Sequence, residues 1–182
     1  MEPIVTAGKP IINISECIKI EEEYLVDLND VINIDSSFCL NESKIDSGKL
    51  IYKSIEKMHD KEHFVCSNED DPELLFYIPF KSQVDIKSMT MIGGENGTAP
   101  LHIKLYTNQE NPDFSLLEQN KFVMEFECSD NIEGEIYELK PNKFKSVTSL
   151  TLIVCKNHGA NYSKVYYLSF TGTRTRVSCF KS

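Results

Sequence analysis

The sequence predicts an all-β fold, an antiparallel β-sandwich of jelly-roll type, and three observations support this. Several segments alternate apolar and polar residues with a period of two, the pattern of strands that rest one face on a core. Clusters rich in Asn, Asp, Gly and Pro separate these segments at the intervals expected of a sandwich. The 182 residues suit one domain, large enough to bury a core without disulfides or metal.

The predicted domain does not fill the whole chain. Residues 1–22 lack strong patterning and are expected to form a weakly structured N-terminal arm. The sandwich domain is expected over residues 23–175, and residues 176–182 form a short C-terminal tail.

The clearest strand is Leu74–Phe80, in which every second side chain is apolar and lies on the same face. Pro79 cannot donate a ladder hydrogen bond, so this strand is expected to end there or to run at a sheet edge. After Ile86 the apolar phase slips by one residue, which predicts a β-bulge near Lys87 and Ser88.

Later segments continue the β pattern. Leu101–Leu105, Phe122–Cys128 and Tyr166–Phe170 each predict a strand with one buried face. Ser149–Cys155 is apolar on both faces, which indicates a central strand covered on both sides.

Two segments depart from this pattern. Asp113–Gln119 has a helical pattern, with Asp113 as a suitable N-cap. Residues 44–63 fit neither period well, so their structure is left open.

The composition argues against several classes of function. The net charge of −9 opposes binding to nucleic acid or to an anionic membrane, because both require clustered Lys and Arg. The chain contains no apolar run of the ~18 residues that span a bilayer, and no secretory leader is visible. We therefore expect an intracellular protein, located in the cytoplasm and the nucleus. The cysteines are widely spaced without a C-x-x-C pair, so free thiols are expected at Cys17, Cys39, Cys66, Cys128, Cys155 and Cys179.

Few residues suggest chemistry. His59, His63 and Cys66 are spaced to place three metal ligands on one face of a helix, but Phe64–Cys66 looks like the start of a strand, which would break that register. Exposed histidines in a charged segment are the preferred reading. Gly93–Gly97 resembles a phosphate-binding loop, yet it precedes a strand rather than a helix. No nucleophile motif is present. We expect no catalytic residue, no metal and no cofactor.

Five segments, in order, resemble one known family. Cys39–Ser43 resembles the opening signature of the PITH domain, a proteasome-interacting module. Asp71–Phe80 is similar to the acidic turn and strand of that family, and Leu101–Asn108 to a later strand. Cys155–Ala160 and Tyr166–Gly172 resemble its closing hairpin.

This resemblance implies a jelly roll of the galactose-binding-like type. It also implies a function: a non-enzymatic, monomeric interaction module that binds the proteasome regulatory particle as an adaptor or modulator. A fused relative contains a thioredoxin domain, but this chain has no C-x-x-C pair, so that redox chemistry is not carried over.

Polar loop residues within or beside the matching segments are the candidates for partner binding. They are Asn41, Glu42, Glu69, Asp70, Asp71, His158 and Asn161. Their alternative role is turn formation, since Asn and Asp readily bond to their own backbone.

Two other functions remain open. A jelly roll of this type could bind a small carbohydrate-like ligand at one end, although the chain contains no Trp for stacking on a sugar. An enzyme without a recognisable motif is the third alternative, because fold alone does not determine function.

Overall fold

The computed structural model describes residues 25–130 and 132–174, so the predicted arm and tail lie outside the described residues. Strands dominate this part of the chain. In order they are β1 (Val26–Asp27), β2 (Phe38–Leu40), β3 (Val65–Cys66), β4 (Leu74–Gly93), β5 (Pro100–Thr107), β6 (Met124–Glu127), β7 (Glu135–Glu138), β8 (Val147–Asn157) and β9 (Lys164–Arg174). Short helical turns connect them: η1 (Asn29–Val31), η2 (Ile34–Ser36), η3 (Ser47–Ile51), η4 (Ile55–Lys57), α2 (Leu116–Gln119) and η5 (Pro141–Lys143).

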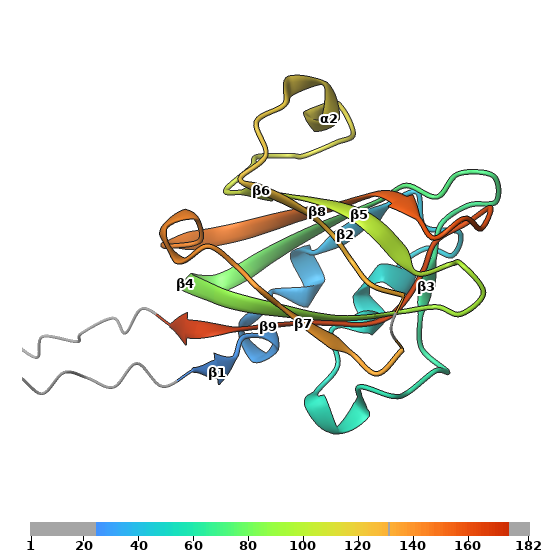
Figure 1. Cartoon of the computed structure of the whole chain (residues 1–182). Helices are drawn as coiled ribbons and strands as arrows, with labels where there is room; N and C mark the ends of the chain where they lie inside the picture. The colour runs from blue at the N-terminus through green and yellow to red at the C-terminus, as the bar shows by residue number, and fades with distance from the viewer. Residues whose placement is uncertain (1–24, 131, 175–182) are drawn as a thin grey trace, which may run out of the picture.

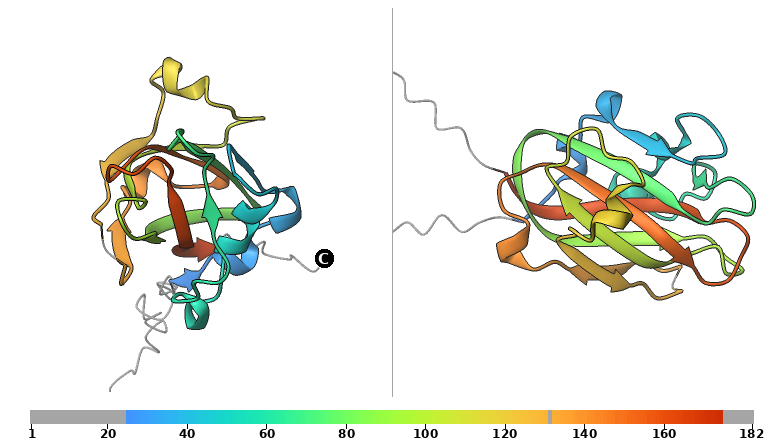
Figure 2. Two further views of the ribbon diagram at one scale, coloured as in Figure 1. Left: turned by 90° about the vertical axis from the view of Figure 1, so that its right-hand side faces the viewer. Right: turned by 90° about the horizontal axis from the view of Figure 1, so that it is seen from above.

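The strands form two layers that share β4 (Figures 1 and 2). The first half of β4 pairs with β2 on one side and β8 on the other, and β8 continues to β5 and β6. The second half of β4 pairs with β7 and β9, and β9 also pairs with the short strands β1 and β3. All of these pairings are antiparallel, which confirms the predicted antiparallel sandwich.

The prediction for Pro79 was wrong. β4 is 20 residues long and runs through Pro79 to Gly93. It crosses from one layer to the other where its register with β8 shifts, between Pro79 and Val84. The Pro79 carbonyl accepts the Asn33 N–H at 2.8 Å. In an antiparallel strand the backbone N–H and C=O of one residue point to the same side. The N–H that proline lacks would therefore have pointed toward Asn33 and not toward β8. An interior proline is therefore tolerated here.

The main core lies between the two layers. It contains the inward residues predicted for the first half of β4, and the inward face of β8. Ile153, on the other face of β8, is also fully buried, so this strand is covered on both sides as expected.

The alternation in Phe122–Cys128 and Tyr166–Phe170 predicts that Phe122 and Tyr166 face the main core, and both predictions were wrong. Phe122 precedes β6 and packs in a separate cluster with Tyr106 and Leu116. Tyr166 packs with Ile92 and Tyr167 on another side of the molecule. The β4–β9 register shifts beside it, between Ile92 and Gly93, and such a shift reverses the face that a residue occupies.

The predicted bulge, the unassigned segment and the predicted helix agree better with the sequence patterns. The register of β4 with β9 shifts between Ile86 and Ser88, which confirms the predicted bulge. Residues 44–63 contain the helical turns η3 and η4. The predicted helix is shorter than expected and begins at Leu116, because Asp113 forms a preceding turn in which its carboxylate accepts the Ser115 N–H at 2.9 Å.

The described cysteines are free thiols at Cys39, Cys66, Cys128 and Cys155, while Cys17 and Cys179 lie outside the described residues. Burial raises the pKa of all four thiols, that of Cys128 to about 12. The thiolate is the nucleophile, so these side chains are poor nucleophiles near neutral pH. Among the described residues no helix is long and apolar enough to cross a membrane.

Candidate protein-interaction surface

Four loops meet at one end of the sandwich, which we call the loop end: residues 41–47, 67–73, 94–99 and 158–163. It lies at the right in Figure 1 and faces the viewer at the left of Figure 2. Backbone hydrogen bonds join the loops. The Ser67 N–H donates to the Ser163 carbonyl at 2.9 Å, and the His158 N–H donates to the Ala99 carbonyl at 3.1 Å. This bonding makes the loop end a preorganised surface.

All seven predicted partner-binding residues belong to three of these loops, so the fold brings them to the same end of the molecule. They do not all present free side chains. Some are used to hold the loops together, and the structure separates the two roles residue by residue.

Asn41 is mainly a link between loops. Its φ of 69° is in the left-handed region, which Asn tolerates better than most residues. Its amide nitrogen donates to the Glu73 carbonyl at 2.7 Å, and its side-chain oxygen accepts from the Asn68 amide at 2.8 Å. Both ends of the side chain are therefore occupied, as the turn-forming alternative anticipated.

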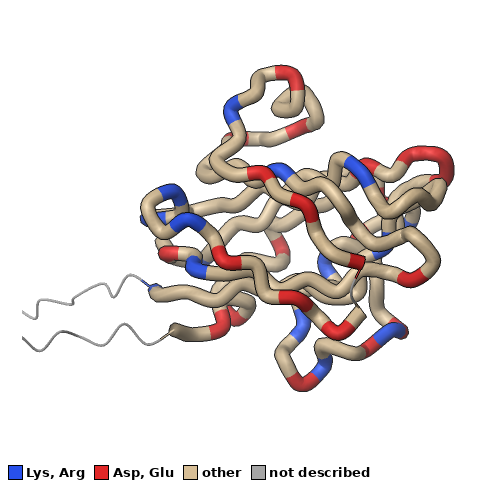
Figure 3. The backbone as a smooth tube through the Cα atoms, in the orientation of Figure 1, with Lys and Arg blue, Asp and Glu red and all other residues tan. Residues whose placement is uncertain are grey.

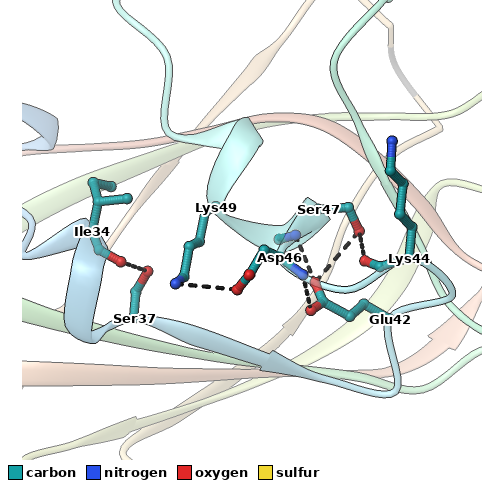
Figure 4. Close-up of polar contacts among 8 residues, drawn as sticks. Ile34, Ser37, Glu42, Lys44, Asp46, Ser47 and Lys49 are labelled. Carbon is teal, nitrogen blue, oxygen red and sulfur yellow. Dashed lines mark hydrogen bonds and ion pairs between the residues drawn. The ribbon is translucent and has the colours of Figure 1, made fainter.

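Glu42 holds the turn that leads into η3 (Figure 4). Its carboxylate accepts the backbone N–H of Asp46 at 2.6 Å and that of Gly48 at 2.7 Å. The Ser47 hydroxyl donates to it at 3.4 Å. A carboxylate that satisfies two backbone donors serves the structure of the turn rather than a partner.

Replacing Glu42 with alanine is expected to lower the free energy of unfolding by about 2 kcal/mol, because two backbone N–H groups lose their acceptor. Denaturant unfolding would measure this loss. Glu69→Ala is the matched control, since Glu69 is exposed in a nearby loop, and it should change stability by less than about 0.5 kcal/mol. Equal stability of the two variants would contradict the structural role of Glu42.

The acidic turn between β3 and β4 carries three consecutive carboxylates at the loop end, Glu69, Asp70 and Asp71 (Figure 3). Glu69 and Asp70 are exposed, and Asp70 adopts a φ of 62° at the tip of the turn. Asp71 is half-buried, and its carboxylate accepts the Glu73 N–H at 3.1 Å. Glu69 and Asp70 are thus better placed than Asp71 to meet a partner.

The β8–β9 loop contains two of the predicted residues, His158, which is hydrogen-bonded to another loop, and Asn161, which is exposed. The His158 ring nitrogen Nε2 lies 3.0 Å from the Cys128 carbonyl, which links this loop to the end of β6. A carbonyl only accepts, so this nitrogen carries the proton. Asn161 is exposed and remains available for contact.

Sequence reasoning missed a cluster of aromatic and charged side chains at the loop end. Lys61 forms an ion pair with Glu95, and the Tyr166 hydroxyl donates to Glu95 at 2.7 Å. These two hydrogen bonds, that from Lys61 foremost, lower the pKa of Glu95 to about 2. The Lys164 ammonium lies 4.1 Å from the centre of the Phe64 ring. The one signal of this cluster in the sequence is the spacing of Lys164 and Tyr166, which places them on the same face of a strand. Their contacts with Lys61, Phe64 and Glu95 depend on the fold.

The buried Lys53 positions the segment that carries Lys61. Its ammonium donates to the carbonyls of His63 at 2.6 Å and Asp60 at 2.8 Å. The three residues weighed above as metal ligands, His59, His63 and Cys66, do not share a helix. His63 bonds to the Asp60 carboxylate at 2.8 Å, while Cys66 lies in β3 opposite Lys164 of β9. Within residues 25–130 and 132–174 no three His, Cys, Asp or Glu side chains are grouped to hold a metal.

Solved structures with a similar fold include carbohydrate-binding modules. A Clostridium perfringens family 32 module in complex with galactose superimposes with a TM-score of 0.59, covering 81% of this chain and 99% of that one, at 6% identity. Another module from the same organism, in complex with a galactose-containing disaccharide, gives 0.58 at 11% identity, covering 80% and 99%. At such identities the likeness concerns the fold alone, and it confirms the galactose-binding-like jelly roll.

Sequence comparison gives the family. "PITH domain-containing protein 1" of Dictyostelium discoideum is 38% identical over 149 residues, which are 81% of this chain and 73% of that protein. The human protein of the same name is 33% identical over 147 residues, 80% of this chain and 69% of that protein. The sequence model of the PITH domain matches residues 19–179. The chain therefore belongs to the PITH domain family.

Proposed function

We propose that this protein is a non-catalytic interaction module that binds the regulatory particle of the proteasome, as an adaptor or modulator, in the cytoplasm and nucleus. It acts as a monomer through its loop end. The observation that carries this proposal is the exposed acidic turn, Glu69 and Asp70, displayed on loops that hydrogen bonds hold in place. Family membership supports the choice of partner.

The physical argument concerns the cost of association. Binding requires interface loops to become ordered, and loops that are already joined lose less entropy on docking. The acidic turn and the net charge of −9 favour encounter with a basic surface on the partner. Attraction of this kind is screened by salt, so association should slow as ionic strength rises.

The carbohydrate-binding alternative gains no specific support from the loop end. A sugar would need an open aromatic face, and two aromatic side chains beside this end, Phe64 and Tyr166, already face an ammonium group. Lys164 lies 4.1 Å from the ring centre of Phe64 and 4.8 Å from that of Tyr166. The likeness to sugar-binding modules rests on the fold, so we do not propose this function.

A pull-down of intact proteasome with the purified full chain tests the proposal. The test variant is Glu69→Lys with Asp70→Asn, which changes the charge of the turn while asparagine tolerates the positive φ at residue 70. We expect the wild type to retain proteasome at low salt and less at high salt, and the variant to retain several-fold less.

The matched control is Glu118→Lys with Glu110→Gln, which makes the same change of charge on exposed residues away from the loop end. It should bind like the wild type. Failure of the wild type to retain any proteasome at low salt would refute the partner, whereas equal binding by both double variants would refute the acidic turn as the contact.

A further inference from the structure

A second surface lies on the outer face of the layer formed by β7, β4 and β9. Leu168 and Phe170 of β9 belong to the core, so the alternating residues Tyr167 and Ser169 face outward. Together with η4 and β1 they line a groove of about 230 Å³, which we call the sheet groove. It is separate from the acidic turn of the loop end.

The sheet groove is lined by exposed apolar side chains as well as by Thr90, Ser169 and Thr171. Ile136 of β7 is 67% exposed and Ile55 of η4 is 63% exposed, the two largest values after Ile45 among the exposed large apolar side chains of the described residues. Met58 lines the groove beside Ile55 and packs against the Tyr167 cluster. Apolar side chains gathered at a groove, rather than scattered singly, are typical of binding surfaces.

Carboxylates accompany these apolar walls. Asp27 lines the groove, and one of its oxygens accepts the Asn29 N–H at 2.9 Å. Glu56 follows Ile55 on η4 and is exposed. Burial is the main cause that raises the pKa of the Tyr167 phenol; the hydrogen bond with Ser169 lowers it, and the negative charges of Asp27 and Glu56 raise it. The described residues that line the groove include no Lys or Arg.

The presence of both apolar side chains and carboxylates at the sheet groove indicates which kind of side chain from a partner it can bind. A purely apolar side chain would cover the Asp27 carboxylate without giving it a partner, and the desolvation of an unpaired charge is costly. A Lys or Arg side chain satisfies both features, because its alkyl stem packs on apolar walls while its charged head meets carboxylates.

We propose that the sheet groove binds a long basic side chain, Lys or Arg, presented by an extended segment of a protein partner. The alkyl stem contacts Ile55, Met58 and Ile136, and the cationic head is directed to Asp27 and Glu56. The site is independent of the proteasome proposal and can be tested on the protein alone.

The test is an NMR titration of the ¹⁵N-labelled full chain with two capped five-residue peptides. One carries lysine at its centre between two valines, and the other carries uncharged norleucine instead. We expect the lysine peptide to cause saturable shifts at the amides of Thr90, Ile136 and Tyr167. The norleucine peptide should bind about ten-fold more weakly, as expected for loss of a charge-assisted contact.

Two variants and a control locate the site. Glu56→Gln should weaken binding of the lysine peptide about three-fold, the size expected of an exposed ion pair, and Ile136→Ser should weaken both peptides. Glu62→Gln, an exposed carboxylate in the same charged segment but outside the groove lining, should leave binding unchanged. Equal affinity for the two peptides, shifts confined to other surfaces, or no shifts at all would overturn the proposal.

Discussion

Gly172→Ala is expected to destabilise the protein by about 3 kcal/mol, which would lower its melting temperature by about 6–12 °C. Gly172 lies in β9 between Val26 of β1 and Ile86 of β4. A Cβ atom at this position would lie 1.9 Å from the Asp85 carbonyl oxygen and 3.0 Å from a Leu28 methyl. The obstacle is backbone of a central strand, which cannot rotate away as a side chain could.

Thermal unfolding followed by circular dichroism would measure this effect. Thr173→Ala, at the next position of the same strand, is the matched control because it removes atoms instead of adding them. It should shift the melting temperature far less. A Gly172→Ala protein as stable as the wild type would show that β4 and β9 separate more easily at this point than the structure indicates.

Asn29→Ala is expected to cost about 3 kcal/mol of stability as well, because Asn29 completes the sheet where β1 ends. Its amide donates to the Leu168 carbonyl at 3.0 Å and to the Lys53 carbonyl at 3.2 Å. Its side-chain oxygen accepts the Phe170 N–H at 3.2 Å. One buried side chain thus satisfies backbone groups of β9 that no further residue of β1 reaches.

Denaturant unfolding of three variants separates this explanation from simple packing. Asn29→Leu fills a similar volume without hydrogen-bonding groups and should be about as unstable as Asn29→Ala. Asn161→Ala, an exposed asparagine, should change stability by less than about 0.5 kcal/mol. If leucine restored stability, the hydrogen bonds of Asn29 would not be what the protein requires.

The strands were the most predictable part of the fold. Alternation in Leu74–Phe80 identified the core face of that segment, because the pleat assigns successive side chains to opposite faces, but it missed the burial of Leu75 on the other face. The doubly apolar Ser149–Cys155 is covered on both sides, as predicted. The bulge after Ile86 was visible as a slip of the same pattern. The prediction for Pro79 was wrong because the sequence shows that proline lacks a backbone N–H, but not the direction in which that N–H would have pointed.

The candidate site was predictable in location more than in role. Matching family segments pointed to loops that the fold does place together. They did not show that Glu42 is committed to Asp46 and Gly48, or that Asn41 is committed to Glu73. Asn and Asp in loops serve turns and partners alike, so composition does not separate the two roles.

The sequence by itself determined the β class, the positions of the longer strands β4, β5, β8 and β9, and the family, since these depend on local patterns and ordered motifs. Tertiary structure alone decided that β4 belongs to both layers and that Lys61, Glu95 and Tyr166 meet at the loop end. It likewise decided that Ile55, Ile136 and Asp27 line one groove. These groups are distant along the chain, and what joins them is the pairing of strands through backbone hydrogen bonds, which carry no sequence-specific signal.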